Sequence, residues 1–208
     1  MQIPAIIMAG GKSKRFNFEK INSKYQEKSL LTIRGKSLIE YIIDAALACK
    51  KINKVIVAVS PYTPNTKSLI TSRSQLIEII DTPGAGYHSD ILFIVKALKL
   101  GISITIVADL PLIKPEILDE IIEQYFVLKK SALSVMADVK LFNQHGLTPT
   151  IIFKSENGQK NLVPLGINVI DGRFIDQPEL NQAIFISKRV ELIYNINTVD
   201  DYIQLKKL

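Results

Sequence analysis

The sequence predicts an α/β fold whose mixed, mostly parallel sheet is covered by helices on both faces. Two observations carry this prediction. Short β-branched runs alternate along the chain with amphipathic helical patterns, and such an order is typical of parallel strands joined by helical crossovers. The length of 208 residues is enough for a sizeable core, which favours a single domain over residues 1–208.

Four apolar runs are expected as buried strands of the parallel part. Nearly continuous apolar runs are typical of strands that are covered on both faces. The runs are PAIIMA (4–9), KVIVAVS (54–60), LIEII (76–80) and SITIVAD (103–109).

Helices are expected between these strands and at the end of the chain. Residues 37–48 and 115–126 each place their apolar side chains on one face, and Pro115 suits a first helical turn. The segment TVDD (198–201) predicts a final helix with Thr198 as its N-cap.

After residue 130 the pattern changes and predicts hairpin-like strands that make the sheet mixed. Turn sequences, NQHG and ENGQ, separate three short apolar runs. The runs are ALSVMADV, TPTIIF and VPLGINVI.

Composition limits the classes of partner and location. The net charge of +6 favours acidic ligands, and phosphorylated small molecules satisfy it as well as nucleic acid does. Nucleic-acid binding is the less expected of the two, because the sequence has no recognition helix, aromatic stacking stripe or clustered basic face. The single cysteine, Cys49, excludes an internal disulfide framework and fits a cytoplasmic protein. No uninterrupted apolar run reaches about 18 residues, so no membrane insertion is expected.

A glycine turn follows the first strand and is expected to bind phosphate. Gly10 and Gly11 tolerate positive φ and lack side chains, so their backbone N–H groups can face an anion. The turn is not a P-loop, which requires a glycine where Ile6 stands, and GxGxxG is absent as well. A basic segment then runs to Ser29 and can surround a triphosphate, although a solvated loop is the alternative. Its cations are Lys12, Lys14, Arg15, Lys20, Lys24 and Lys28.

Two carboxylates follow other strands. Asp109 ends an apolar run and is suited to hold Mg²⁺ against phosphate oxygens, with a helix or turn cap as the alternative. Asp81, with Gly84 and Gly86 after it, can accept hydrogen bonds from a ribose hydroxyl or a guanine edge. A plain turn capped by Ser89 is the alternative there.

Several motifs together resemble the nucleotidyltransferase superfamily that includes molybdenum-cofactor guanylyltransferases and sugar-phosphate nucleotidyltransferases. These are MAGGKSKR, EKSLLTIRGKSLIEY and VADLPLI. Four further stretches are similar to the archaeal adenosylcobinamide-phosphate guanylyltransferases of cobamide synthesis: SPYTPNTK, DTPGAGY, VPLGINVI and YNINTVDDY.

The resemblance implies a three-layer α/β/α Rossmann-like nucleotidyltransferase fold. It also implies Mg²⁺-dependent transfer of GMP from GTP to adenosylcobinamide phosphate. Two alternatives remain: nucleotidyl transfer to molybdopterin or a sugar phosphate, and a nucleotide-binding regulatory module without turnover.

The resemblance further implies roles for matching residues. Arg15 and Lys28 would hold the phosphates, Asp109 would bind Mg²⁺, and VPLGIN would form part of the acceptor side. The other residues expected around the nucleotide are Met8, Ala9, Gly10, Gly11, Lys12, Asp81, Gly84, Gly86, Asn195 and Asn197, together with Asp200 nearby. For the last three residues, a helix-capping turn is the alternative.

Two Glu-Lys pairs compete for the family position, Glu19-Lys20 and Glu27-Lys28. We align the second pair, because SLLTIRGKSLIEY follows it as in the family, although Ser29 replaces the usual proline. His88 and His145 are expected as a helix-start residue and a turn residue rather than ligands, and Cys49 is expected in a core.

Overall fold

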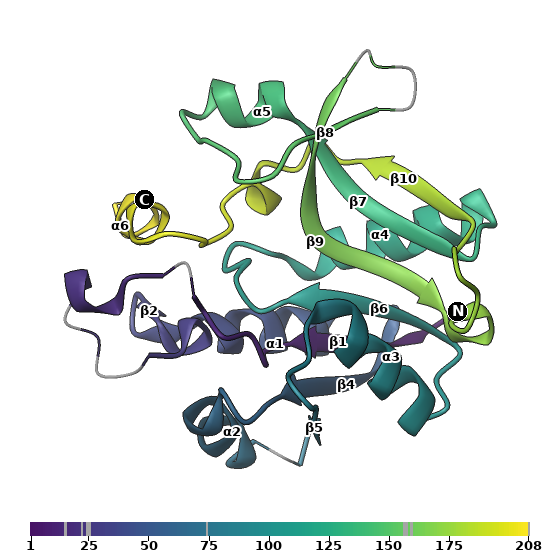
Figure 1. The fold of residues 1–208 in the computed structure, drawn as a ribbon, viewed down its shortest axis with the longest axis horizontal. Helices are drawn as coiled ribbons and strands as arrows, with labels where there is room; N and C mark the ends of the chain where they lie inside the picture. Colours follow the sequence, from purple (N-terminus) through teal and green to yellow (C-terminus); the bar gives the residue numbers. More distant parts are fainter. Residues whose placement is uncertain are drawn as a thin grey trace.

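A computed structural model describes residues 1–14, 16–21, 23, 26–73, 75–155, 158 and 160–207. Within these residues, eight strands form one mixed sheet in the order β10-β7-β9-β6-β1-β4-β5, with β8 paired to β9 (Figure 1). Their bounds are β1 (Ile3–Met8), β4 (Ile52–Val59), β5 (Glu78–Asp81), β6 (Ile102–Val107), β7 (Ala132–Asp138), β8 (Phe153–Lys154), β9 (Asn161–Asp171) and β10 (Gln182–Ile186).

The parallel half of the sheet is centred on β1. This strand pairs in parallel with β4 and β6, and β4 pairs in parallel with β5. All four predicted strands are therefore confirmed, with ends that differ from the expected ones by one or two residues. Their carboxyl ends meet at one edge of the sheet, where α/β proteins of this kind bind ligands.

The second half makes the sheet mixed, as predicted. β9 runs antiparallel to β6, β7 and β8, whereas β10 is parallel to β7. Within TPTIIF only Phe153 belongs to a strand, so the expected strand there is largely wrong. The expected turn NQHG is in part helical, because α5 (Val139–Gln144) begins after Asp138, whose side chain accepts the Lys140 N–H at 2.9 Å. Three residues of ENGQ lie outside the described part.

Helices cover both faces of the sheet, so the three-layer arrangement is confirmed. On β1, Ala5 and Ile7 belong to the core under α1 (Leu38–Ala48), α2 (Pro64–Thr71) and α4 (Pro115–Leu128). Ile6 lies between them and belongs to the opposite core under α3 (Tyr87–Ala97). This alternation is the period of two that places successive side chains on opposite faces.

The last helix, α6 (Val199–Leu205), packs against the basic segment near the other end of the chain (Figure 1). The predicted N-cap is confirmed, because Thr198 Oγ1 accepts the Asp201 N–H at 3.2 Å. Phe16 shares a small apolar cluster with Tyr202, whose hydroxyl donates to the Thr32 carbonyl at 2.8 Å. Thr32 begins a short hairpin of β2 (Thr32–Ile33) and β3 (Lys36–Ser37).

Cys49 is buried at the end of α1, as expected. Burial raises the pKa of its thiol to about 12, and the Sγ–H donates to Asp119 Oδ1 at 3.1 Å. No helix in the described part has the length and apolar character needed to cross a membrane.

Candidate nucleotide site

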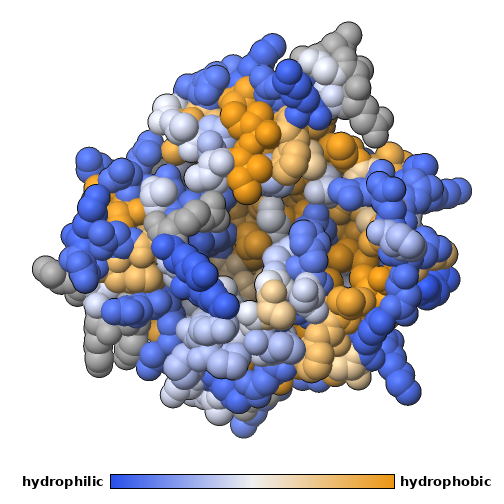
Figure 2. All heavy atoms as spheres, viewed as in Figure 1, coloured by the Kyte–Doolittle hydropathy of each residue, from blue (hydrophilic) through white to orange (hydrophobic). Residues whose placement is uncertain are grey.

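A cavity of about 330 Å³ lies at the carboxyl ends of β1 and β6. Its volume is within the range of small-molecule sites. Figure 2 shows this face of the molecule hollowed near its middle, with apolar side chains in the hollow and hydrophilic ones around the outer edge. The lining residues are Met8, Ala9, Gly10, Gly11, Lys12, Ser13, Lys28, Ser29, Ala58, Thr82, Gly84, Ala85, Gly86, Tyr87, Asp90, Val107, Ala108 and Asp109.

The glycine turn forms one wall of this cavity, but not with the backbone expected from the sequence. Neither Gly10 nor Gly11 has a positive φ; the left-handed residue is Ser13, with φ of 49°. Gly10 is required for close approach instead, because a Cβ there would lie 3.0 Å from Ser60 Cβ. Ser60 Oγ also donates to the Gly10 carbonyl at 2.7 Å, which fixes the turn against β4.

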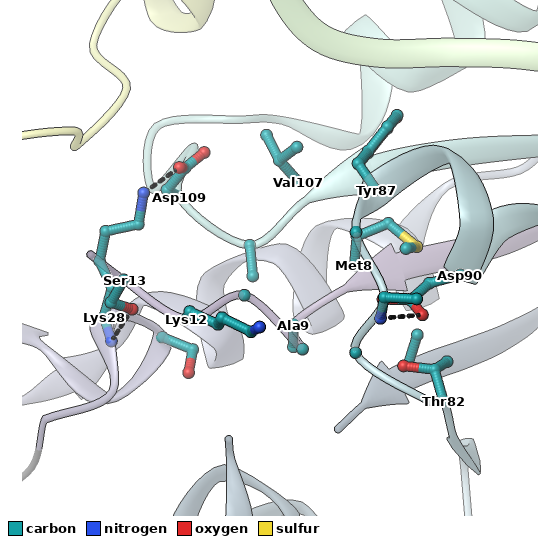
Figure 3. A pocket seen from close by; sticks show the side chains of 18 residues that line it. Met8, Ala9, Lys12, Ser13, Lys28, Thr82, Tyr87, Asp90, Val107 and Asp109 are labelled. Carbon is teal, nitrogen blue, oxygen red and sulfur yellow. Dashed lines mark hydrogen bonds and ion pairs between the residues drawn. The ribbon is translucent and has the colours of Figure 1, made fainter. Parts of the chain in front are cut away.

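Lys28 and Asp109 meet at one end of the cavity, where they form an ion pair (Figure 3). Lys28 belongs to the short helix η2 (Lys28–Leu30), and its backbone N–H donates to Ser13 Oγ at 3.2 Å. Asp109 follows β6, and its carbonyl accepts the Ile196 N–H at 3.0 Å. The two charged side chains are thus placed by four separate segments of the chain.

Asp109 has an acceptor atom available for a ligand. Its side chain is 13% exposed, and Oδ2 faces Lys28. Oδ1 is buried and has no hydrogen-bond partner in the described part of the chain. A buried carboxylate oxygen without a donor fits a hard cation such as Mg²⁺. Among the described residues, no three His, Cys, Asp or Glu side chains gather to hold a metal by themselves.

Glu27 is the residue that anchors Lys28, and it is 4% exposed. Its carboxylate accepts from Asn65 N and Nδ2 at 2.9 and 2.7 Å, and from Thr66 N and Oγ1 at 2.7 and 2.6 Å. Both backbone donors belong to the first turn of α2, so Glu27 caps this helix from a distant segment. The other Glu-Lys pair lies in an exposed short helix, η1 (Phe18–Ile21), outside the cavity lining.

A second cavity of about 320 Å³ adjoins the first and shares Gly11, Lys12, Ser13 and Lys28 with it. Its remaining lining residues are Lys14, Phe16 and Asn197. Lys12 Nζ lies 4.3 Å from the ring centroid of Tyr62. Because Lys12, Lys14 and Lys28 all line it, the second cavity is strongly basic, as a site for phosphate groups requires.

Three of the sequence-predicted residues belong to the segments around this end: Arg15, Asn195 and Asn197. Arg15 lies outside the described residues. Asn195 lines neither cavity, whereas Asn197 does. The backbone N–H groups of Asn197 and Thr198 both donate to Asp201 Oδ2, so the capping turn is present alongside the cavity contact.

The opposite end of the first cavity is formed by Thr82, by residues 84–87 and by Asp90 of α3 (Figure 3). Gly84 and Gly86 line it, as expected, and both have positive φ. Asp81 does not line the cavity. Its side chain is 65% exposed and pairs with Lys67 at 2.7 Å. The alternative of a turn capped by Ser89 is wrong, since α3 starts at Tyr87 and Ser89 lies inside it.

Asp90 and Tyr87 are cavity residues that sequence reasoning missed. Asp90 carries a detectable signal, because it shares the buried stripe of α3 with Ile91 and Ile94, where a charged residue is unusual. Tyr87 OH pairs with Thr105 Oγ1 at 3.0 Å, and burial raises the pKa of its phenol.

A polar network connects this cavity to β9. Asn168 Nδ2 donates to Tyr87 OH at 2.9 Å, and Asn168 belongs to the VPLGIN stretch. Gly166 of the same stretch has φ of 71°, and a Cβ there would overlap the Val107 side chain at the cavity wall. Neither residue lines the cavity itself, so VPLGIN lies directly behind it. His88 and His145 also lie outside both linings.

Comparison with known proteins places this geometry in context. The MobA-like NTP transferase domain matches residues 5–155. The adenosylcobinamide-phosphate guanylyltransferase of Methanocaldococcus jannaschii is 34% identical over 95% of this chain and 92% of its own length. A probable molybdenum cofactor guanylyltransferase of Pyrococcus horikoshii is 30% identical over 64% of this chain and 61% of its own.

Solved structures agree with the fold. A CMP:2-keto-3-deoxy-manno-octonic acid synthetase complexed with CTP superposes with a TM-score of 0.72, at 13% identity, and covers 100% of this chain and 98% of its own. A 4-diphosphocytidyl-2C-methyl-D-erythritol synthase of Anaerococcus prevotii gives 0.68 at 13% identity, with 99% and 95% coverage. At such identities the likeness concerns the fold alone.

Proposed function

Because the chain belongs to the MobA-like NTP transferase family, we propose that it transfers GMP from GTP to adenosylcobinamide phosphate. The products are adenosylcobinamide-GDP and pyrophosphate. The family supports the reaction type, and the cavity at the carboxyl ends of β1 and β6 offers a glycine turn, a lysine and an aspartate at the place where a triphosphate would lie.

The observation that carries the choice of acceptor is the extent of the similarity. The likeness to the M. jannaschii adenosylcobinamide-phosphate guanylyltransferase spans 95% of this chain, so it extends far beyond the family domain at residues 5–155. The likeness to the P. horikoshii protein spans 64%. The part of the chain beyond residue 155 contains β9, and Asn168 of this strand donates to the Tyr87 hydroxyl at the cavity.

In the proposed complex the triphosphate lies over residues 10–13, between the two cavities. Lys28 and Lys12 line both of them, and Lys14 lines the second. Three ammonium groups beside one triphosphate oppose the charge that builds up on the leaving pyrophosphate. We propose Arg15 as a further phosphate ligand, on the family resemblance alone.

Asp109 is the residue proposed to hold Mg²⁺, and its unpaired Oδ1 is the atom suited to it. A bound Mg²⁺ would supply charge neutralisation at the phosphate oxygens. A single carboxylate suffices for this, because Mg²⁺ in nucleotide sites is held largely by phosphates and water. With nucleotide bound, Lys28 would exchange its contact with Asp109 for one with phosphate.

The chemical step needs no general base from the protein. The terminal phosphate of the acceptor attacks the α-phosphorus of GTP in line, a new P–O bond forms, and the bond to pyrophosphate breaks. Since a phosphate monoester has a second pKa of about 6, the nucleophile is already dianionic at neutral pH. This agrees with a cavity lining that contains no histidine among the described residues.

The test is to incubate the purified protein with each NTP and acceptor pair and to measure pyrophosphate release. The proposal expects turnover with GTP and adenosylcobinamide phosphate that exceeds turnover with molybdopterin or a sugar phosphate. Preference for molybdopterin would identify a molybdenum cofactor guanylyltransferase instead, the function named for the P. horikoshii relative. GTP binding without pyrophosphate release under any acceptor would indicate a regulatory module.

A further inference from the structure

The phosphate chemistry does not explain the position of Asp90, and its one hydrogen bond to the loop, from the Ala85 N–H, explains it only in part. It lies in the first turns of α3 and lines the cavity at the end opposite Lys28 and Asp109 (Figure 3). It is 5% exposed, so its carboxylate is almost fully withdrawn from bulk water. A charge in such a place is costly unless it is compensated by partners.

Within the described chain, this carboxylate has few partners. Oδ1 accepts the Ala85 N–H at 3.2 Å, and no cation of the described residues pairs with it. Two carboxylate oxygens offer about four acceptor positions. The Asp90 carboxylate can therefore accept further hydrogen bonds, and it lines the wall of the cavity.

We propose that Asp90 reads the guanine base by accepting hydrogen bonds from its N1–H and 2-amino groups. This inference rests on the proposed function, since it places the base of GTP at this end of the cavity. Guanine presents two adjacent donors on one edge, and a carboxylate is the side chain that matches them. Adenine presents an acceptor at N1, which the carboxylate repels.

The surroundings of Asp90 suit a flat base. Gly84 and Gly86 both have positive φ. A Cβ at Gly86 would meet open space, whereas a Cβ at Gly84 would lie 2.7 Å from the Tyr62 ring, so Gly84 lets the loop pack against Tyr62. Tyr87 contributes an aromatic ring to the same end. Asp81, the carboxylate expected from the sequence at the base or the ribose, is exposed and paired with Lys67.

The same carboxylate also fixes Ala85, so a plain loss of activity in a variant would not separate base reading from loop support. The ratio of GTP to ITP does separate them, because hypoxanthine lacks only the 2-amino group. A charge-assisted hydrogen bond corresponds to about tenfold or more in affinity. The wild-type protein is therefore expected to bind GTP at least about tenfold more tightly than ITP.

Asp90→Asn keeps an oxygen that can accept the Ala85 N–H but replaces the other oxygen by a donor. We expect the ratio of GTP affinity to ITP affinity to fall to about one in this variant. XTP carries an acceptor at C2, so the variant should bind XTP more tightly than the parent does. The GTP-to-ITP affinity ratio of Asp90→Ala should also fall to about one. Asp176→Asn is the matched control: the Asp176 carboxylate is exposed, lies outside the cavity lining and pairs with Lys96 of α3, so the ratio should stay at the parental value.

Equilibrium titrations with GTP, ITP and XTP give these values without an acceptor, and thermal unfolding checks that each variant is folded. Equal affinity of the wild type for GTP and ITP overturns the inference, even if Asp90 variants fail to fold. An unchanged ratio in Asp90→Asn, or a collapsed ratio in Asp81→Asn alone, overturns it too. Absence of GMP transfer with an intact, Asp90-dependent ratio would instead refute the proposed function.

Discussion

Replacing Glu27 by alanine should destabilise the protein strongly, although Glu27 does not line the cavity. Its buried carboxylate accepts four hydrogen bonds from two consecutive residues at the start of α2. The substitution leaves two helix-terminal N–H groups and two side-chain donors without this acceptor. Thr66 Oγ1 keeps its contact with Ser29 Oγ at 2.6 Å, so part of the loss is recovered.

The size of the effect follows from these contacts. A lost helix cap costs about 1 kcal/mol, and each buried donor left without a partner costs about 1–3 kcal/mol. We expect the free energy of unfolding to fall by about 3–4 kcal/mol in total. With a urea m-value of about 2 kcal/mol/M, the unfolding midpoint should fall by about 1.5–2 M.

Urea unfolding followed by far-ultraviolet circular dichroism measures this shift. Glu19→Ala is the matched control, because Glu19 also precedes a lysine but is exposed, and its stability should change by no more than about 0.5 kcal/mol. GMP transfer should also decline in Glu27→Ala, since Lys28 follows directly. Equal midpoints for Glu27→Ala and the parent would refute the reasoning.

Two further predictions concern charged side chains elsewhere. Lys28→Ala and Asp109→Ala should fold yet transfer GMP at least about 100-fold more slowly, whereas Lys20→Ala should remain close to the parent in a pyrophosphate-release assay. A larger loss in Lys20→Ala than in Lys28→Ala would show that the wrong Glu-Lys pair was aligned. Hydrogen bonds from Arg173 hold the pKa of Asp171 below its ordinary value of 3.8. The stability difference between parent and Asp171→Asn should be full above that pH and vanish as the pH falls further below it. A pH-independent difference, measured by thermal unfolding between pH 2 and 7, would contradict this.

The parallel half of the fold could be predicted because its information is local. Each buried strand is a continuous apolar run, and the helices carry a clear apolar face. The edge strand β10 was missed, since it is five residues long, partly exposed, and defined by its pairing with β7. The helix α5 was missed because six residues are too few to display a helical period.

The residues of the candidate site could be predicted where they directly follow a strand. They could not be predicted where tertiary packing determines which side chain faces the cavity. Gly10, Lys28 and Asp109 line the cavity, as their positions along the chain indicate. The choice between Asp81 and Asp90 depends on how the loop at residues 82–86 turns, and this is set by glycine conformations that a sequence does not display. The remaining sequence signal for Asp90 was its place in the apolar stripe of α3.

The packing of α6 on the basic segment links the two ends of the polypeptide. The hydrogen bond from Tyr202 to Thr32 spans 170 positions, so this packing beside the second cavity cannot form while the chain is still short on the ribosome. Contacts of such long range form slowly, because a large loop must close first. The nascent protein should therefore complete the strands of its sheet before α6 packs beside the second cavity.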